Sequence, residues 1–378
     1  MARQGGRAAR QAAVLAAGSA ALGRELRRPD LIRDSHRTMV LRCADVDGPA
    51  GGDGTAIVKA YPPGPDGDCG FAAEAAGLAV AGDTGMAPEL LAADPPSRTV
   101  VMSDLGRAPS LADVLLGASE DQAAAAVVDW ADACGRLAVA TAGREAPLAR
   151  LRRQYAGGEP ADPPWAGLRQ RVLQVEQRAA LAGVAAPDGL AAELAEVAAA
   201  VASRDYLVFS PGDICPDNNL LTAAGIRFID FEASGYHPVF FDVAYLRMPF
   251  STCWCVFRLP VRLRDAAEER YRAQVVRIWP PLADDRTWRR GVRNAVAAWS
   301  LSSMGWLLGQ ALAGDVSLEP DAVAAPRTRQ LMRHRWQVLA GELEAAGELP
   351  AIAAMARALL TATVGWHAEE LPLYPALR

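Results

Sequence analysis

Short, largely apolar runs bounded by polar and Gly-rich stretches mark the first third of the chain as rich in β-strands. Two such runs, 37–44 and 55–61, flank a Gly- and Asp-rich stretch, which is the pattern of a β-hairpin. A third strand is predicted at 99–103. The stretch 71–81 is dominated by Ala, Gly and Leu and predicts a helix that carries a single acid, Glu74.

After residue 105 the apolar positions recur at helical spacing. Ser110 and Asp113 have the spacing of a capped helix start. Further helices are predicted at 121–142, 187–203, 263–278, 285–313, 328–346 and 349–364. The longest apolar stretch, 295–313, contains three Ser and a Gln. It therefore predicts a buried helix rather than a membrane span.

Three short apolar runs lie in the middle of the chain. The first, 206–209, is typical of a buried strand, and the loop after it carries Asp213. The next two, 219–222 and 226–229, are joined by Ala-Ala-Gly. Three residues with a closing Gly favour a β-hairpin.

Polar residues with oxygen atoms flank this predicted hairpin. Asn218 and Asp230 are equidistant from Ala224, so antiparallel pairing would bring their Cβ atoms to about 5 Å from each other. An amide and a carboxylate at that distance suit Mg²⁺, which prefers oxygen ligands. Asp213 would be a third oxygen group in the same space. Each of the three alone is an ordinary turn residue, and it is their common spacing that predicts a metal site.

Composition narrows the class of protein. Of 378 residues, 22% are charged and 51% are apolar, which is typical of a soluble globular chain long enough for two lobes. The net charge of −5 argues against a nucleic-acid partner, which needs a basic face. The six Cys do not form a disulfide scaffold, and Cys253 and Cys255 are too close for a zinc-type Cys-x-x-Cys pair. We expect reduced thiols in a cytoplasmic protein.

Lys59 is the only lysine in a chain whose other basic residues are Arg. It lies near the end of the second predicted strand. A single retained lysine suggests a position where Arg will not serve, because an ammonium is compact whereas the guanidinium fork is larger and planar. Such a position is a phosphate-contacting site.

Two motifs carry a family resemblance. Gly212-Asp213 with Asn218 five residues after the Asp, followed by Ile229-Asp230-Phe-Glu232, resembles the aminoglycoside phosphotransferase-like enzymes, small-molecule relatives of protein kinases. The resemblance implies a two-lobed, protein-kinase-like α+β fold that uses ATP and Mg²⁺. It makes Asp213 the catalytic residue and Asn218 and Asp230 the Mg²⁺ ligands. Pro211 stands where the family usually has His.

The same resemblance assigns the nucleotide site. It implies that Lys59 contacts the phosphates and that Glu74 pairs with it. Ser35 lies in the segment that matches the nucleotide loop of the family. Met102 and Asp104 lie at the position of the hinge between the lobes, where backbone groups would meet the adenine.

The expected organisation follows. Residues 1–30 would be a flexible or helical extension, 31–105 the β-rich N-lobe, and 106–378 the helical C-lobe. The predicted activity is transfer of the γ-phosphate of ATP to a hydroxyl group of a small molecule, with no nucleic-acid or membrane partner. Pro211 leaves open a pseudokinase that binds nucleotide without turnover. A protein kinase would need a Gly-rich loop and an Asp-Phe-Gly triplet. The acceptor and the oligomeric state stay open.

Overall fold

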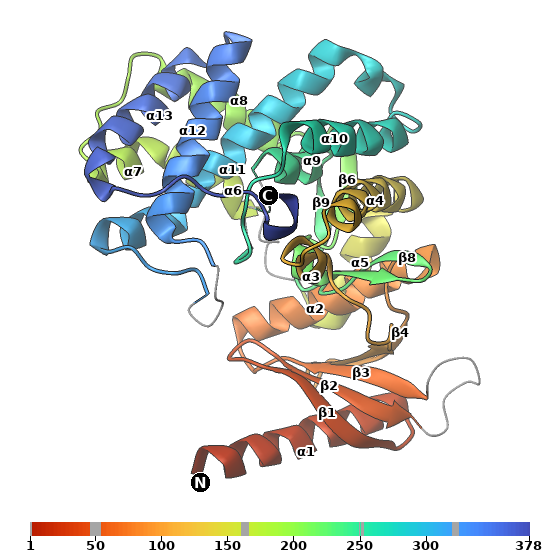
Figure 1. Cartoon of the computed structure of the whole chain (residues 1–378). Helices are drawn as coiled ribbons and strands as arrows, with labels where there is room; N and C mark the ends of the chain where they lie inside the picture. The colour runs from red at the N-terminus through yellow and green to blue at the C-terminus, as the bar shows by residue number, and fades with distance from the viewer. Residues whose placement is uncertain (1, 46–53, 160–165, 249, 251–252, 320–324) are drawn as a thin grey trace.

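The computed structural model describes residues 2–45, 54–159, 166–248, 250, 253–319 and 325–378. It shows an α+β chain in two lobes, a small β-rich N-lobe and a larger, mostly helical C-lobe (Figure 1). This is the arrangement that the sequence predicts. Most of the loop predicted between the first two strands lies outside the described residues.

The N-lobe sheet has five antiparallel strands in the order β1-β2-β3-β5-β4. Their bounds are β1 Leu26–Asp34, β2 Met39–Asp45, β3 Thr55–Ala60, β4 Leu90–Asp94 and β5 Thr99–Ser103. Strands β2, β3 and β5 confirm the three predicted strands. The edge strands β1 and β4 were not predicted, because β1 contains Pro29 and is mostly exposed, so it lacks apolar alternation.

Two helices cover the two faces of this sheet, α1 (Ala2–Leu22) and α2 (Pro65–Ala81) (Figure 1). Val14 of α1 packs with Met39 and Val58 of the sheet in a small apolar core. Of the two alternatives predicted for the start of the chain, flexible or helical, Ala2–Leu22 is helical, and the boundary predicted at residue 30 falls inside β1. On the other face, α2 lies between the sheet and the C-lobe and is mostly buried.

The C-lobe confirms the helices predicted after residue 105. Its helices are α3 Leu111–Leu115, α4 Glu120–Ala140, α5 Glu145–Ala156, α6 Ala166–Leu173, α7 Val175–Leu181, α8 Leu190–Val201, α9 Phe240–Arg247, α10 Val261–Val275, α11 Asp285–Ala313, α12 Thr328–Ala346 and α13 Pro350–Ala362. The capping box of Ser110 and Asp113 begins α3 as predicted. Helix α11 runs through the lobe and contacts α6, α8, α9 and α12. No helix in the described ranges has both the length and the apolar character of a membrane span.

Two small two-stranded antiparallel sheets form the middle of the chain. Strand β6 (Leu207–Ser210) pairs with β9 (Gly235–Pro238), and β7 (Asn219–Thr222) pairs with β8 (Gly225–Phe228). Short 3-10 helices lie at Gly82–Thr84, Pro216–Asn218, Pro280–Ala283, Val364–Trp366 and Pro375–Leu377. The β7–β8 hairpin confirms the predicted one, but its register differs by one residue.

The register differs because Gly225 belongs to the strand. It pairs with Thr222, so the pairing is not centred on Ala224. Its φ of +97° is the left-handed conformation that glycine adopts readily. As a result the backbone oxygen of Asn218 accepts from the backbone N–H of Ile229 at 2.9 Å. The prediction that Asn218 lies directly opposite Asp230 is wrong by one position.

Candidate functional site

The alternation of β3 places Lys59 on the face of the sheet away from α1. Ala56, Val58 and Ala60 point into the core beneath α1, so Lys59 points toward α2. Its Nζ donates to Glu74 Oε2 of α2 at 2.8 Å, which is the pair that the sequence predicts. The same Nζ donates to Asp230 Oδ1 at 2.6 Å, after a gap of 171 residues along the chain. One ammonium thus joins the sheet, α2 and the C-lobe.

Because the cluster is buried, each charge in it strongly affects the pKa values of the others. Burial alone lowers the pKa of Lys59, but the carboxylates of Asp230 and Glu74 outweigh it and hold that pKa well above its usual range. Burial raises the pKa of Glu74, and Lys59 offsets only part of this. Burial also opposes ionisation of Asp230, but the charge and hydrogen bond of Lys59 bring its pKa below the usual value. Lys59 is therefore charged, and its charge favours the ionised form of Asp230 more than that of Glu74, whose pKa stays raised.

The backbone at Asp230 has an uncommon conformation. Its φ is +67°, which few residues other than glycine adopt. Asp230 comes two residues after the end of β8, where continued extended backbone would carry the chain along the hairpin. The left-handed conformation turns the chain at this point, and the carboxylate contacts Lys59. Strain of this kind is typical of residues held for function.

The loop that carries Asp213 is held by amide side chains. The Nδ2 group of Asn218 donates to the backbone oxygen of Asp213 at 3.1 Å. The Nδ2 group of Asn219 donates to the backbone oxygens of Ile214, at 3.1 Å, and of Cys215. Asn219 is fully buried, and sequence reasoning did not single it out. These bonds fix the loop from inside and leave the Asn218 oxygen as the atom that a cation would bind.

Gly212 allows this loop to lie against the chain that follows Asp230. Its φ is +96°, and a Cβ atom there would lie 2.1 Å from the backbone oxygen of Ala233. No side chain fits at that distance, so position 212 requires glycine. The preceding residue, Pro211, is buried. The loop before Asp213 is therefore buried at both Pro211 and Gly212.

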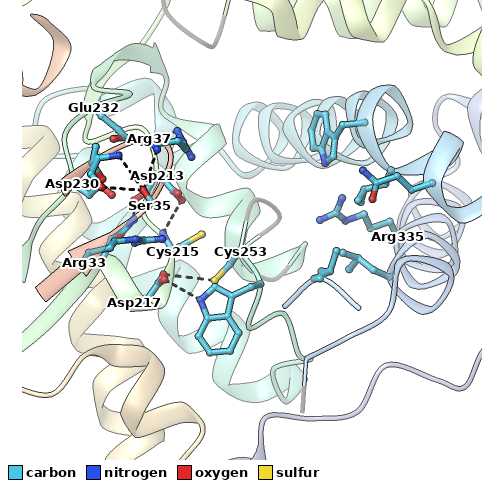
Figure 2. Close-up of a pocket in the computed structure, with 18 residues that line it drawn as sticks. Arg33, Ser35, Arg37, Asp213, Cys215, Asp217, Asp230, Glu232, Cys253 and Arg335 are labelled. Carbon is cyan, nitrogen blue, oxygen red and sulfur yellow. Dashed lines mark hydrogen bonds and ion pairs between the residues drawn. The ribbon is translucent and has the colours of Figure 1, made fainter. Parts of the chain in front are cut away.

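A cavity of about 380 Å³ gathers the predicted catalytic and metal residues. Asp213, Asn218 and Asp230 all line it, as does Ser35 from the turn between β1 and β2. Its remaining lining residues are Arg33, Arg37, Thr38, Cys215, Asp217, Glu232, Cys253, Trp254, Trp306, Leu307, Gln310, Leu318, Leu331 and Arg335. Figure 2 shows Arg335 on the side of the cavity away from Asp230 and Glu232. Both lobes thus contribute to one cavity.

Three predicted nucleotide residues have mainly structural contacts. Ser35 Oγ accepts from the backbone N–H of Thr38 at 3.0 Å and so closes the β1–β2 turn. Met102 is buried in the apolar core on the α2 side of the sheet. The Asp104 carboxylate accepts from Arg42 at 2.6 and 3.0 Å and from Thr55 at 2.8 Å. The Asp104 side chain is therefore engaged within the protein.

Sequence reasoning missed several residues of this site. The Nη2 group of Arg37 donates to Glu232 at 2.6 Å and links the β1–β2 turn to the C-lobe. Outside this cavity, His237 lies in β9, and its Nε2 is 2.8 Å from Asp242 Oδ1. Asp217 and Trp254 line the cavity. The only local signal for Asp217 is its place beside Asn218.

Comparison with known proteins gives a family and a fold. A family model described as the phosphotransferase enzyme family matches residues 47–290. Among curated proteins none matches the chain. Choline kinase from Cryptosporidium parvum Iowa II superposes with a TM-score of 0.50 at 15% identity, over 87% of this chain and 93% of the kinase.

Two further solved structures align over most of their length. A choline/ethanolamine kinase family protein from Mesorhizobium loti has 16% identity and a TM-score of 0.47, over 88% of this chain and 92% of the other. Macrolide 2'-phosphotransferase MphH from Brachybacterium faecium has 16% identity and a TM-score of 0.47, over 92% and 97%.

Proposed function

The chain belongs to the phosphotransferase enzyme family, and from this premise we propose that it transfers the γ-phosphate of ATP to a hydroxyl group of a small molecule. One observation carries the proposal. Lys59 pairs with Glu74 at 2.8 Å and with Asp230 at 2.6 Å, and Asp230 shares its cavity with Asp213 and Asn218. A phosphate-binding cation, two oxygen ligands and a candidate base therefore lie together.

The donors suit Mg²⁺. Asn218 offers an amide oxygen and Asp230 an ionised carboxylate, both at the cavity, and such hard oxygen ligands fit this ion. Bound there, Mg²⁺ would neutralise charge on the phosphates. Lys59 would exchange its contact with Asp230 for a phosphate oxygen, while Glu74 keeps the ammonium in place. Asp213 would orient the acceptor hydroxyl and accept its proton.

We also propose that residues 31–105 supply nucleotide contacts and residues 106–378 the catalytic and acceptor contacts. Ser35 would act from the β1–β2 turn, which reaches the cavity. The Asp104 side chain is engaged with Arg42, so the hinge at 102–104 would offer its backbone to the adenine. The free cysteines among the described residues fit the reducing cytoplasm.

The test is ADP release from ATP and Mg²⁺ against a panel of hydroxyl-bearing small molecules. On a verified acceptor, Asp213→Asn should lower turnover by about 10² or more, because loss of a general base costs 10² to 10⁴. Asn218→Ala should raise the Mg²⁺ concentration needed for half-maximal rate. Asp121→Asn, on the exposed start of α4, is the matched control. Unchanged turnover in Asp213→Asn would exclude Asp213 as the base.

Pro211 favours one second candidate, a pseudokinase that binds nucleotide without turnover. Pro fixes φ near −65° and stiffens the loop before Asp213, so we expect Pro211→His to change the rate far less than Asp213→Asn. Nucleotide binding with no ADP release on any acceptor would favour the pseudokinase. Absence of nucleotide binding would exclude both candidates.

A further inference from the structure

Two thiols and a carboxylate meet at the edge of the cavity, and a third thiol lies next to them. The ligand atoms of Cys215, Asp217 and Cys253 all lie within 4.8 Å of one another. Cys255 lies outside this group, but its Sγ is 3.0 Å from that of Cys253, so a small movement would bring it in as the fourth donor. Figure 2 shows Cys215, Asp217 and Cys253 side by side. We propose that these four side chains bind one Zn²⁺ ion.

The donor set and its burial suit zinc. Structural zinc sites are four-coordinate and tetrahedral, with thiolates at about 2.3 Å and carboxylate oxygens at about 2.0–2.2 Å. Cys215 is 2%, Cys253 5% and Cys255 0% exposed, so few water molecules compete for the ion. On one zinc ion the sulfurs would lie roughly 3.8 Å apart. The Cys253 and Cys255 sulfurs, now 3.0 Å apart, need to separate only slightly.

The carboxylate is already oriented for this role. Trp254 Nε1 donates to Asp217 Oδ2 at 3.0 Å. The other oxygen, Oδ1, faces Cys253 Sγ at 3.8 Å. A hydrogen bond that fixes a ligand from behind is the usual support of a protein metal site. Here Trp254 holds one carboxylate oxygen and leaves the other toward the thiols.

The tertiary fold supplies a set of ligands that the spacing of the cysteines in the sequence does not predict. Cys253 and Cys255 are too close in sequence to form a Cys-x-x-Cys pair, but the chain bends at Trp254 and Cys255, and the two Sγ atoms lie 3.0 Å apart. The third and fourth donors come from the loop after β6, about 40 residues earlier in the sequence. Soft thiolates select zinc, whereas Mg²⁺ prefers oxygen ligands such as Asn218 and Asp230. The two sites would therefore hold different ions.

A zinc ion here would fix the loop that carries Asp213. Cys215 follows Asp213 by two residues, and Cys253 and Cys255 follow α9. Each thiol that binds releases its proton to water. The ion would thus tie the loop after β6 to the cavity wall. This zinc site does not depend on the proposed phosphotransfer.

The test uses the full chain, purified with reductant and stripped of metal, and Co²⁺ as a probe. The wild type should bind one equivalent and develop the thiolate-to-cobalt charge-transfer band and the intense visible bands of a tetrahedral site. Zn²⁺ should then displace Co²⁺ and bleach these bands, while millimolar Mg²⁺ should not. Loss of a ligand in Cys253→Ala should weaken binding by roughly 100-fold or more. Asp217→Asn should weaken it while keeping the Trp254 hydrogen-bond acceptor.

Two controls make the result decisive. Cys69→Ala removes a thiol from α2, away from the cluster, and should bind Co²⁺ as the wild type does. Far-ultraviolet circular dichroism identifies any variant that fails to fold, and Asp217→Asn then carries the test. No tetrahedral spectrum in the wild type, or equal spectra in Cys253→Ala and Cys69→Ala, would overturn the proposal. So would a disulfide between two of the proposed ligands, seen as four rather than six thiols when the chain is denatured without reductant.

Discussion

Lys59 has little room for a larger cation. Its ammonium contacts Glu74 at 2.8 Å and Asp230 at 2.6 Å, and the residue is 6% exposed. A guanidinium is planar and larger. We predict that Lys59→Arg, like Lys59→Ala, weakens ATP binding by at least 10-fold, about 1.4 kcal/mol, measured by titration calorimetry. Arg107→Lys, at an exposed position, should bind ATP like the wild type. Wild-type affinity in Lys59→Arg would remove the argument from the single lysine.

Asp104 supports the N-lobe in a pH-dependent way. Its partly buried position disfavours the charge, but hydrogen bonds from Arg42, the Gly106 backbone and Thr55 bring its pKa below the usual 3.8. A lowered pKa means that the ionised form stabilises the fold above that pH, and that this contribution is lost as pH falls through the folded-state pKa. Asp104→Asn should therefore lower the free energy of unfolding by about 1–3 kcal/mol at pH 7.

The difference between Asp104→Asn and the wild type should shrink as pH falls below about 4. Denaturant melts at pH 7 and pH 3.5 measure it. Asp30→Asn is the control, since its ion pair with Arg107 is exposed and should cost under about 1 kcal/mol. An equal effect of Asp104→Asn at both pH values would contradict the linkage.

At the scale of the element, the sequence predicted those strands and turns whose conformation depends on residues close to them in the chain. Strand β2 alternates between buried and half-buried residues, while β3 and β5 are mostly buried, and all three were predicted. Strand β1, in contrast, pairs through its backbone at a sheet edge with Pro29 inside it. The β7–β8 hairpin was predicted, but its register depends on whether Gly225 belongs to the turn or to the strand. The residue types in the turn do not distinguish these two positions for Gly225, so the predicted register was wrong by one residue.

The residues of the candidate site also divide into those that the sequence predicted and those that only the fold reveals. Asp213, Asn218 and Asp230 lie in motifs. Lys59 is the only lysine and Glu74 the single acid of 71–81. Sequence reasoning therefore found all five, and their contacts and shared cavity are observed in the fold. The partners of Asp217 lie 36 and 37 residues away in sequence. Contacts over such distances come from tertiary packing, which no local pattern contains.

Helix α1 offers a paired test of its packing on the sheet. A Cβ atom at Gly18 would lie 2.8 Å from Val58 Cγ1, while one at Gly6 would meet nothing within 4 Å. Alanine favours a helix over glycine by about 1 kcal/mol at either position, but at Gly18 it overpacks the core, which costs 1–3 kcal/mol. Gly6→Ala should therefore be more stable than Gly18→Ala by about 1–3 kcal/mol in denaturant melts. Equal stabilities would mean that α1 does not pack tightly on β3.

At the scale of the whole molecule, the lobes share buried contacts. The Ser234 hydroxyl of the C-lobe donates to the Ala73 backbone oxygen of α2 at 2.9 Å, and a Cβ atom at Gly77 would lie 2.6 Å from that hydroxyl oxygen. Helix α2 is thus buried against both lobes. We expect the lobes to unfold together as one cooperative unit.

The chain carries separate probes for this prediction. All nine Trp follow residue 105 and report the C-lobe, while Cys43 is 1% exposed in the N-lobe core. Tryptophan fluorescence and pulsed thiol labelling of Cys43, read by mass spectrometry, should give the same denaturant midpoint. Labelling of Cys43 at lower denaturant would show that the N-lobe unfolds first.

The burial of the only lysine also affects how the protein can be handled. Lys59 is the sole side-chain amine in the sequence, it is protonated, and it lies between two carboxylates. Amine-directed reagents, such as activated esters for dyes, biotin or surface coupling, therefore find no side-chain target in the folded protein. They would attach at the chain's amino terminus alone. A second label per molecule would count those chains in which the ion-pair cluster around Lys59 had opened, so amine labelling also reports on the conformation of this cluster.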